Sequence, residues 1–104
     1  MRFVRCVVAV LAMLPAAGPT AGQQTAANVA RSLAATCANC HGTNGISVGE
    51  VPALAGMPKD DLVRKMQDFK AGRVPGSIMP QLAKGYTDEQ IDLIAGWFAA
   101  QQAK

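Results

Sequence analysis

The chain has 104 residues, a formal net charge of +3 and a hydrophobic fraction of 50%. This length allows one small domain at most. Two of its ten basic residues, Arg2 and Arg5, lie in an N-terminal segment that we expect to be removed, so the remaining charge is nearly balanced. The composition therefore predicts binding neither to nucleic acid nor to an anionic membrane surface.

Residues 1–22 have the layout of a secretory signal peptide. A basic start is followed by an apolar run from Cys6 to Leu14 and then by a stretch rich in small residues. A membrane-spanning helix needs about 20 apolar residues, so this run is too short for an anchor. We expect cleavage after Gly22, with Gly18 as a second possible site. The mature domain, residues 23–104, is then periplasmic and has no membrane span.

The first predicted element is a helix from about Thr25 to Cys40. Thr25 suits the N-cap, and the apolar residues Val29, Leu33 and Cys37 recur at intervals of four. These three residues are therefore expected on the buried face of the helix.

The end of this helix contains Cys37-Ala38-Asn39-Cys40-His41, a Cys-x-x-Cys-His motif. This arrangement attaches haem covalently, because two thiols one helical turn apart can add to the two vinyl groups of a haem. The next residue, His41, supplies an imidazole nitrogen for the iron. We therefore predict one covalent haem c, attached through Cys37 and Cys40 and ligated by His41.

Two other interpretations of the motif are weaker. A thioredoxin-like redox pair requires a preceding strand and a βαβ pattern, which the sequence does not suggest. A structural zinc site usually has four ligands, and the predicted mature chain offers two Cys and one His. In an oxidising compartment the two thiols would form a disulfide unless another group captured them.

Residues 42–49 are rich in turn formers and are predicted to be a loop. Pro52 follows shortly afterwards. A metal-bound histidine normally donates its other ring N–H to an acceptor that orients the ring, and a carbonyl held rigid by a proline suits this role. We assign the acceptor to Pro52, the alternative being that Pro52 is an ordinary turn residue.

A second helix is predicted from Pro58 to Ala71. Pro58 suits its first position and Gly72 suits its end. Its apolar stripe consists of Leu62, Val63, Met66 and Phe69. Two ion pairs are expected on its solvent face, namely Asp61 with Lys65 and Arg64 with Asp68.

The next predicted loop contains Met79 between Pro75 and Pro80. A haem held by one histidine leaves its opposite axial position open, and a thioether there raises the reduction potential. Of the other methionines in the mature chain, Met66 lies on an apolar stripe and Met57 near a helix start. We therefore predict Met79 as the second iron ligand.

A third helix is predicted from Asp88 to about Gln101. Thr87 and Gln90 form a capping box, and the apolar stripe consists of Ile91, Ile94, Ala95 and Phe98. Gly96 is expected to let the first helix approach closely, with Trp97 or Phe98 at the crossing. Trp97 is predicted to serve core packing rather than electron relay.

Several of these segments together resemble a class I c-type cytochrome of the cytochrome c4 and c-553 kind. They are Cys37 to Gly42, Pro52 to Gly56, the Met79 loop and Ala95 to Phe98. Residues 40–49, 68–72 and 77–86 are also similar to the haem subunit of flavocytochrome c sulfide dehydrogenase. The resemblance implies an all-α fold of about three helices around one covalent haem with an exposed edge. It also implies attachment at Cys37 and Cys40 and axial ligation of the iron by His41 and Met79.

In that family the cytochrome docks on an FAD-containing flavoprotein that oxidises sulfide, and the haem receives the electrons. The resemblance therefore implies a periplasmic single-electron carrier, not catalytic by itself, whose flavoprotein partner is a separate chain. The alternative is a free diffusible cytochrome that serves a terminal oxidase or another reductase. A ring of basic residues around the haem edge would favour the free carrier, because charge steers transient redox encounters. The basic residues available are too few and too scattered to decide, namely Lys59, Lys70, Arg73 and Lys84. A catalytic or gas-sensing haem would need an open axial site. The predicted ligand Met79 would fill that site, so it argues against such a role.

Overall fold

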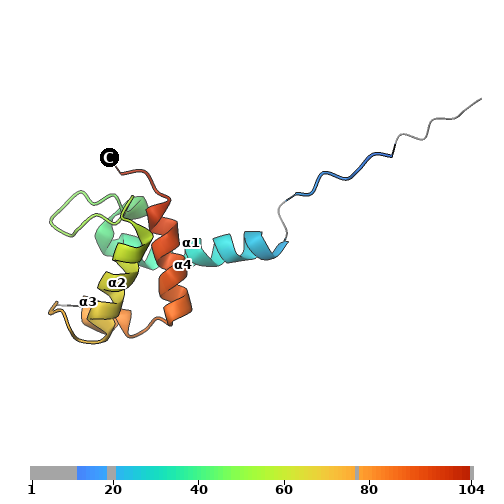
Figure 1. Cartoon of the computed structure of the whole chain (residues 1–104). Helices are drawn as coiled ribbons and strands as arrows, with labels where there is room; N and C mark the ends of the chain where they lie inside the picture. Colours follow the sequence, from blue (N-terminus) through green and yellow to red (C-terminus); the bar gives the residue numbers. More distant parts are fainter. Residues whose placement is uncertain (1–11, 19–20, 77, 104) are drawn as a thin grey trace, which may run out of the picture.

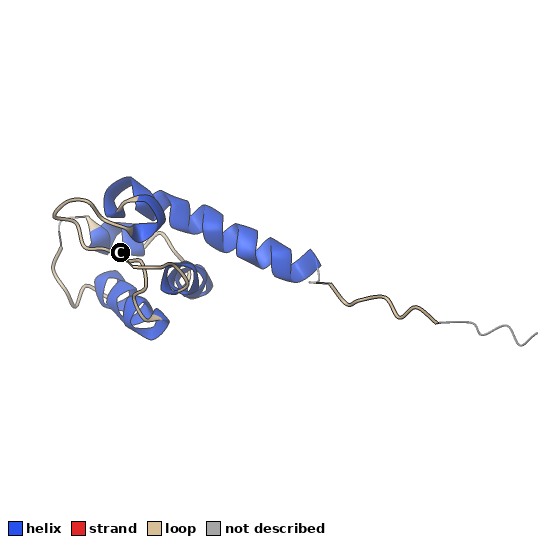
Figure 2. Cartoon of the chain, turned by 90° about the horizontal axis from the view of Figure 1, so that it is seen from above, coloured by secondary structure: helices blue, strands red, loops and turns tan. Residues whose placement is uncertain are grey.

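The structure is a computed structural model that describes residues 12–18, 21–76 and 78–103. In chain order it contains α1 (Ala21–His41), the 3-10 turn η1 (Thr43–Gly45), α2 (Lys59–Lys70), α3 (Met79–Ala83) and α4 (Asp88–Ala99). These described ranges include no strand, which confirms the predicted all-α fold class (Figure 2). Most of the predicted signal peptide lies outside the described residues, so its cleavage stays a prediction.

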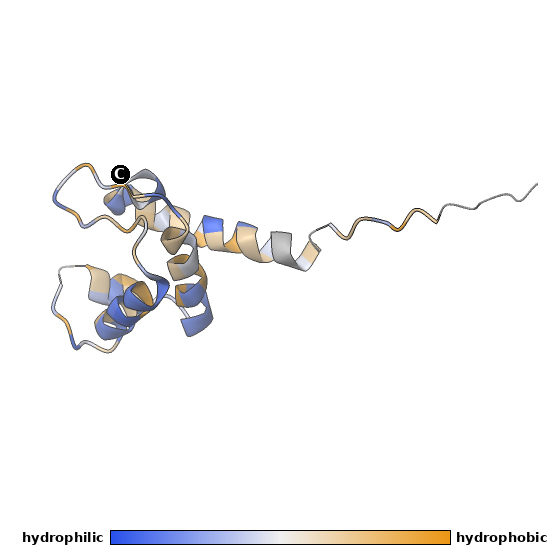
Figure 3. Cartoon of the chain, turned by 45° about the horizontal axis from the view of Figure 1, so that its top comes forward, coloured by the Kyte–Doolittle hydropathy of each residue, from blue (hydrophilic) through white to orange (hydrophobic). Residues whose placement is uncertain are grey.

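Helix α1 crosses α4, and α2 packs against both α3 and α4, while the N-terminal half of α1 projects from the body (Figure 1). The helices carry both hydrophobic and hydrophilic stretches (Figure 3). None of the helices among the described residues combines the length and the apolar character needed to span a bilayer.

Helix α1 differs from the prediction at its start and on its buried face. It begins at Ala21, so Thr25 lies within the helix and its hydroxyl donates to the Ala21 carbonyl at 2.8 Å instead of capping the end. Val29 is 43% exposed, whereas Ala34 is 1% exposed in a core built largely from α4. Leu33 and Cys37 are half-buried against that core, so Ala34 is more deeply buried than any of the three predicted residues.

Helix α2 starts and ends close to the predicted bounds. Pro58 is its N-cap rather than its first helical residue. The helix ends in a Schellman motif, because Gly72, at φ +75°, donates to the Phe69 carbonyl and Arg73 donates to the Asp68 carbonyl. The predicted apolar stripe is confirmed, with two buried members, Leu62 and Met66, and two half-buried members, Val63 and Phe69.

The two ion pairs predicted on α2 are wrong. Asp61 pairs with Arg64 at 3.0 Å, and Asp68 pairs with Arg73, beyond the helix end, at 2.9 Å. The helix also forms two ion pairs with α4, Lys59 with Asp92 and Lys70 with Asp88. An exposed ion pair contributes little free energy, so no single pairing is strongly preferred. Each charged side chain of α2 therefore pairs with whichever opposite charge the fold places nearby.

Helix α3 was not predicted, and with it the described part of the chain has four α-helices where about three were expected. Met79 is its first residue rather than part of a loop, and Pro80 lies in its first turn. Proline is tolerated there because the first N–H groups of a helix have no partner within it. The following amides of Gln81 and Leu82 both donate to the carbonyl of Ile78 at 3.0 Å.

The predicted capping box and apolar stripe of α4 are confirmed. Gln90 N–H donates to the Thr87 hydroxyl at 3.1 Å, and Thr87 N–H donates to the Gln90 side chain at 2.9 Å. The stripe residues are each at most 1% exposed: Ile91, Ile94, Ala95 and Phe98. The helix ends at Ala99, before the predicted Gln101.

The expected role of Gly96 is wrong. A Cβ at this position would meet only the Lys59 side chain, at 3.8 Å, which is ordinary van der Waals contact. Gly96 therefore faces the start of α2 and does not serve a close approach of α1. The neighbouring Trp97 is half-buried and packs edge-to-face on Phe98 at 5.1 Å, in keeping with its predicted packing role.

Candidate haem-binding site

The two cysteines of the motif lie on the last turns of α1 as free thiols. Residues three apart on a helix are neighbours on its surface, so both thiols face the same side. Cys37 is half-buried against the core, and Cys40 is exposed. Burial raises the pKa of the Cys37 thiol, and the nearby Thr36 hydroxyl opposes the shift.

His41, the last residue of α1, has a defined tautomer. Its Nδ1 lies 2.6 Å from the carbonyl oxygen of Pro52. A carbonyl can only accept a hydrogen bond, so Nδ1 carries the proton and donates it. In the neutral ring this tautomer places the lone pair on Nε2, where a metal-ligating imidazole needs it. The contact expected of Pro52 is therefore present, while its role beside a bound iron stays a prediction.

The turn after His41 explains how Pro52 reaches the imidazole. Gly42 and Gly45 have φ values of +87° and +76°, and a Cβ on Gly42 would collide with the backbone of Ile46. The carbonyl of Gly45 then accepts hydrogen bonds from the amides of Leu54 and Ala55 at 2.9 and 3.1 Å. These bonds bring the segment containing Pro52 back against the end of α1. Sequence reasoning treated residues 42–49 as a loop and missed both η1 and this anchor.

The predicted second ligand, Met79, is half-buried and packs against the core at the start of α3. Met66 is a core residue, 6% exposed, as the sequence indicated. Met57 is half-buried like Met79 but belongs to the segment before α2. The thioether of Met79 is thus held at the start of a short helix whose first turn contains a proline, rather than on a free loop.

Apolar side chains are exposed in the same two segments that follow His41 and surround Met79. They are Val48, Val51, Val74, Ile78 and Leu82, which are 39 to 99% exposed. Apolar surface with a few polar groups at defined places is typical of a site for an apolar ligand. Two free thiols, an imidazole with a free Nε2 and a half-buried thioether therefore fit a haem.

Sequence reasoning also missed Thr36 and Tyr86. Their hydroxyl oxygens lie 2.8 Å apart although the residues are separated by 50 positions. No local pattern could have paired them.

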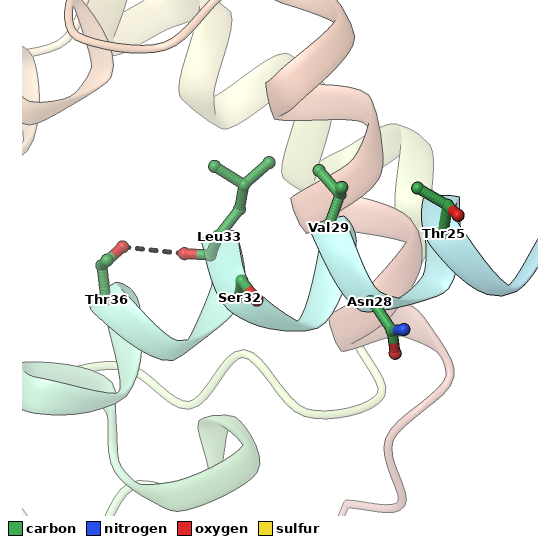
Figure 4. A pocket seen from close by; sticks show the side chains of 6 residues that line it. All are labelled: Thr25, Asn28, Val29, Ser32, Leu33 and Thr36. Carbon is green, nitrogen blue, oxygen red and sulfur yellow. Dashed lines mark hydrogen bonds between the residues drawn. The ribbon is translucent and has the colours of Figure 1, made fainter.

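Thr36 also lies at one end of a groove along α1, and this groove contains none of the predicted haem residues (Figure 4). The groove is lined by Thr25, Asn28, Val29, Ser32, Leu33 and Thr36.

Comparisons with known proteins agree with this site. A family profile described as "Cytochrome c" matches residues 21–100. The cytochrome subunit of sulfide dehydrogenase from Chlorobaculum tepidum is 41% identical over 66 residues, covering 64% of this chain and 60% of that protein. The thiosulfate dehydrogenase electron acceptor from Stutzerimonas stutzeri is 32% identical over 76 residues, covering 71% of this chain and 35% of that protein.

Cytochrome c4 from Azotobacter vinelandii is 33% identical over 79 residues, covering 66% of this chain and 38% of that protein. The chain thus spans 60% of the length of the first of these relatives and less than half of the other two. Cytochromes c carry covalent haem c, so haem c with its iron is the cofactor here. The chain, whose sequence carries one Cys-x-x-Cys-His motif, belongs to the class I cytochrome c family.

Proposed function

We propose that the chain is the haem subunit of a sulfide-oxidising complex and accepts single electrons from a separate FAD-containing flavoprotein. The observation that carries this proposal is the 41% identity to the cytochrome subunit of sulfide dehydrogenase from Chlorobaculum tepidum. In this division of labour the flavoprotein oxidises sulfide, and the present chain provides the exit for the electrons. The haem, when bound, supplies one-electron chemistry between ferric and ferrous iron.

Within this role, Cys37 and Cys40 attach the haem, and His41 and Met79 are the axial ligands. The free thiols and the donated Nδ1–H of His41 support the assignment. The hydrogen bond to Pro52 fixes the orientation of the His41 ring and makes Nε2 a stronger electron-pair donor to a metal. A thioether opposite the histidine favours ferrous iron, which suits a protein that accepts electrons.

We also propose that residues 1–22 are removed during export and that the mature domain works in the periplasm. The basic, apolar and small-residue regions of the N-terminal segment support this proposal. Mass spectrometry of the exported protein tests it, because cleavage after Gly22 leaves Gln23 as the N-terminal residue.

A second candidate function is a free, diffusing electron carrier. It is favoured by the similarity to the thiosulfate dehydrogenase electron acceptor and to cytochrome c4. The two candidates differ in whether a flavoprotein stays bound and in whether sulfide is the source of the electrons.

Purification of the affinity-tagged protein from its own host under anaerobic conditions distinguishes them. The proposal predicts a flavoprotein in stoichiometric amount and reduction of the haem, followed by absorption, when sulfide is added. Two controls are the cytochrome freed of its partner, which excludes direct reduction by sulfide, and thiosulfate as the alternative donor. A lone haem protein with no sulfide-linked partner would contradict the subunit role and leave the diffusible carrier.

A further inference from the structure

Tyr86, in the turn between α3 and α4, is hydrogen-bonded to three helices. Its hydroxyl lies 2.8 Å from the hydroxyl of Thr36 on α1. Its carbonyl oxygen accepts from the ammonium group of Lys70, at the end of α2, at 2.7 Å. Its backbone N–H donates to the carbonyl of Ala83, the last residue of α3, at 3.3 Å. Tyr86 therefore joins the segment that carries Met79 to both α1 and α2.

The Thr36 hydroxyl also lies 4.0 Å from Cys37 Sγ, but its bond to the backbone decides the direction of the contact with Tyr86. The Thr36 hydroxyl donates its one proton to the carbonyl of Leu33 at 2.8 Å (Figure 4). It can then only accept a second hydrogen bond, so the phenolic O–H of Tyr86 is the donor. This bond ends at the residue immediately before Cys37, the first attachment thiol.

Within the described residues, two hydrogen bonds join side chains of α1 to residues that lie outside both α1 and η1. One joins His41 to Pro52, and the other joins Thr36 to Tyr86. The first orients the imidazole that would bind the iron. The second links the same helix to the turn that follows α3, which itself packs against α2.

We propose that Thr36 and Tyr86 are positioning residues, whose hydrogen bond holds α3 so that the Met79 sulfur stays on the iron. This inference rests on the proposed assignment of Met79 as a ligand. Neither residue touches the iron in this proposal. They act by lowering the population of a state in which α3 has moved and the iron has lost its sulfur ligand.

The test measures that population in the ferric holoprotein. Imidazole added to the solution competes with Met79, so its apparent affinity rises with the fraction of protein in which the sulfur has left. A net neutral hydrogen bond corresponds to roughly a 2- to 10-fold change in such an equilibrium. Tyr86→Phe and Thr36→Val should therefore each bind imidazole about 2 to 10 times more tightly than the wild type.

Three further variants show that the hydrogen bond itself is responsible. Thr36→Ser keeps a hydroxyl and should restore the wild-type affinity. Thr25→Val makes the same change on the same helix at a hydroxyl that bonds only to Ala21, so imidazole affinity should not change. The double variant Thr36→Val/Tyr86→Phe should bind imidazole no more tightly than the stronger single variant, because both changes remove one interaction.

Two results would overturn the inference in different ways. If Tyr86→Phe and Thr36→Val unfold at lower denaturant but bind imidazole as the wild type does, the bond is only structural. If the wild-type protein itself lacks the long-wavelength sulfur-to-iron absorption band of ferric haem, Met79 is not a ligand. That second result would contradict the proposed ligand assignment as well, and it is read from the wild type before any variant is made.

Discussion

Replacement of Gly45 by alanine should destabilise the protein by about 2 to 5 kcal/mol. Gly45 has φ +76°, a left-handed conformation that costs an alanine about 1–2 kcal/mol. The added Cβ would also lie 2.8 Å from the ring of Phe98 and 2.9 Å from the backbone nitrogen of Ala55. Phe98 is fully buried, so neither neighbour can move freely, and overpacking of this kind costs about 1–3 kcal/mol more.

Two other glycines separate these contributions in urea unfolding followed by far-UV circular dichroism. Gly72 has φ +75° but open space around it, so Gly72→Ala should cost only the conformational part, about 1–2 kcal/mol. Gly49 has neither a positive φ nor a close neighbour, so Gly49→Ala should change the free energy of unfolding by less than about 0.5 kcal/mol. If Gly45→Ala proves no more destabilising than Gly72→Ala, the proposed clash with Phe98 is refuted.

The remaining predictions concern pH, the iron and the thioethers. Hydrogen bonds from Gln67 and Lys70, with the charge of Lys70, hold the pKa of the Asp88 carboxyl below its usual value. The stability that Asp88 contributes is therefore present above its unfolded pKa of about 3.9 and is lost as the pH falls through the lower folded value. Asp88→Asn should thus lose less stability than the wild type on acidification, as measured by denaturant titrations at several pH values; an identical loss would contradict this. Met79→Ala should lower the midpoint potential, measured by redox titration, by a sizeable part of the about 0.8 V that axial ligands span; an unchanged potential would exclude Met79 as ligand. A variant with both motif cysteines changed to alanine should release its haem on denaturation, whereas the wild type should keep a haem mass in the mass spectrometer.

Local signals were enough to predict the haem and three of the helices, α1, α2 and α4. The Cys-x-x-Cys-His motif specifies covalent haem because its residue types and spacing are themselves the reactive groups. The apolar stripes of α2 and α4 and the capping box of Thr87 and Gln90 were also predicted, since they depend on residues within a few positions of each other. The resemblance to class I cytochromes rests on the same local segments.

Contacts between distant segments were decided only by the tertiary structure. The periodicity of α1 allowed Val29 to be buried, but the crossing with α4 buries Ala34 instead, because two helices approach most closely where side chains are small. The ion pair between Lys59 and Asp92 also depends on the packing of α2 against α4, because an exposed charge pairs with whichever opposite charge lies near it in the folded chain. The hydrogen bond between Thr36 and Tyr86 joins residues 50 positions apart. No periodicity or propensity encodes such a pair, because it exists only once α1 and the turn before α4 have been packed together.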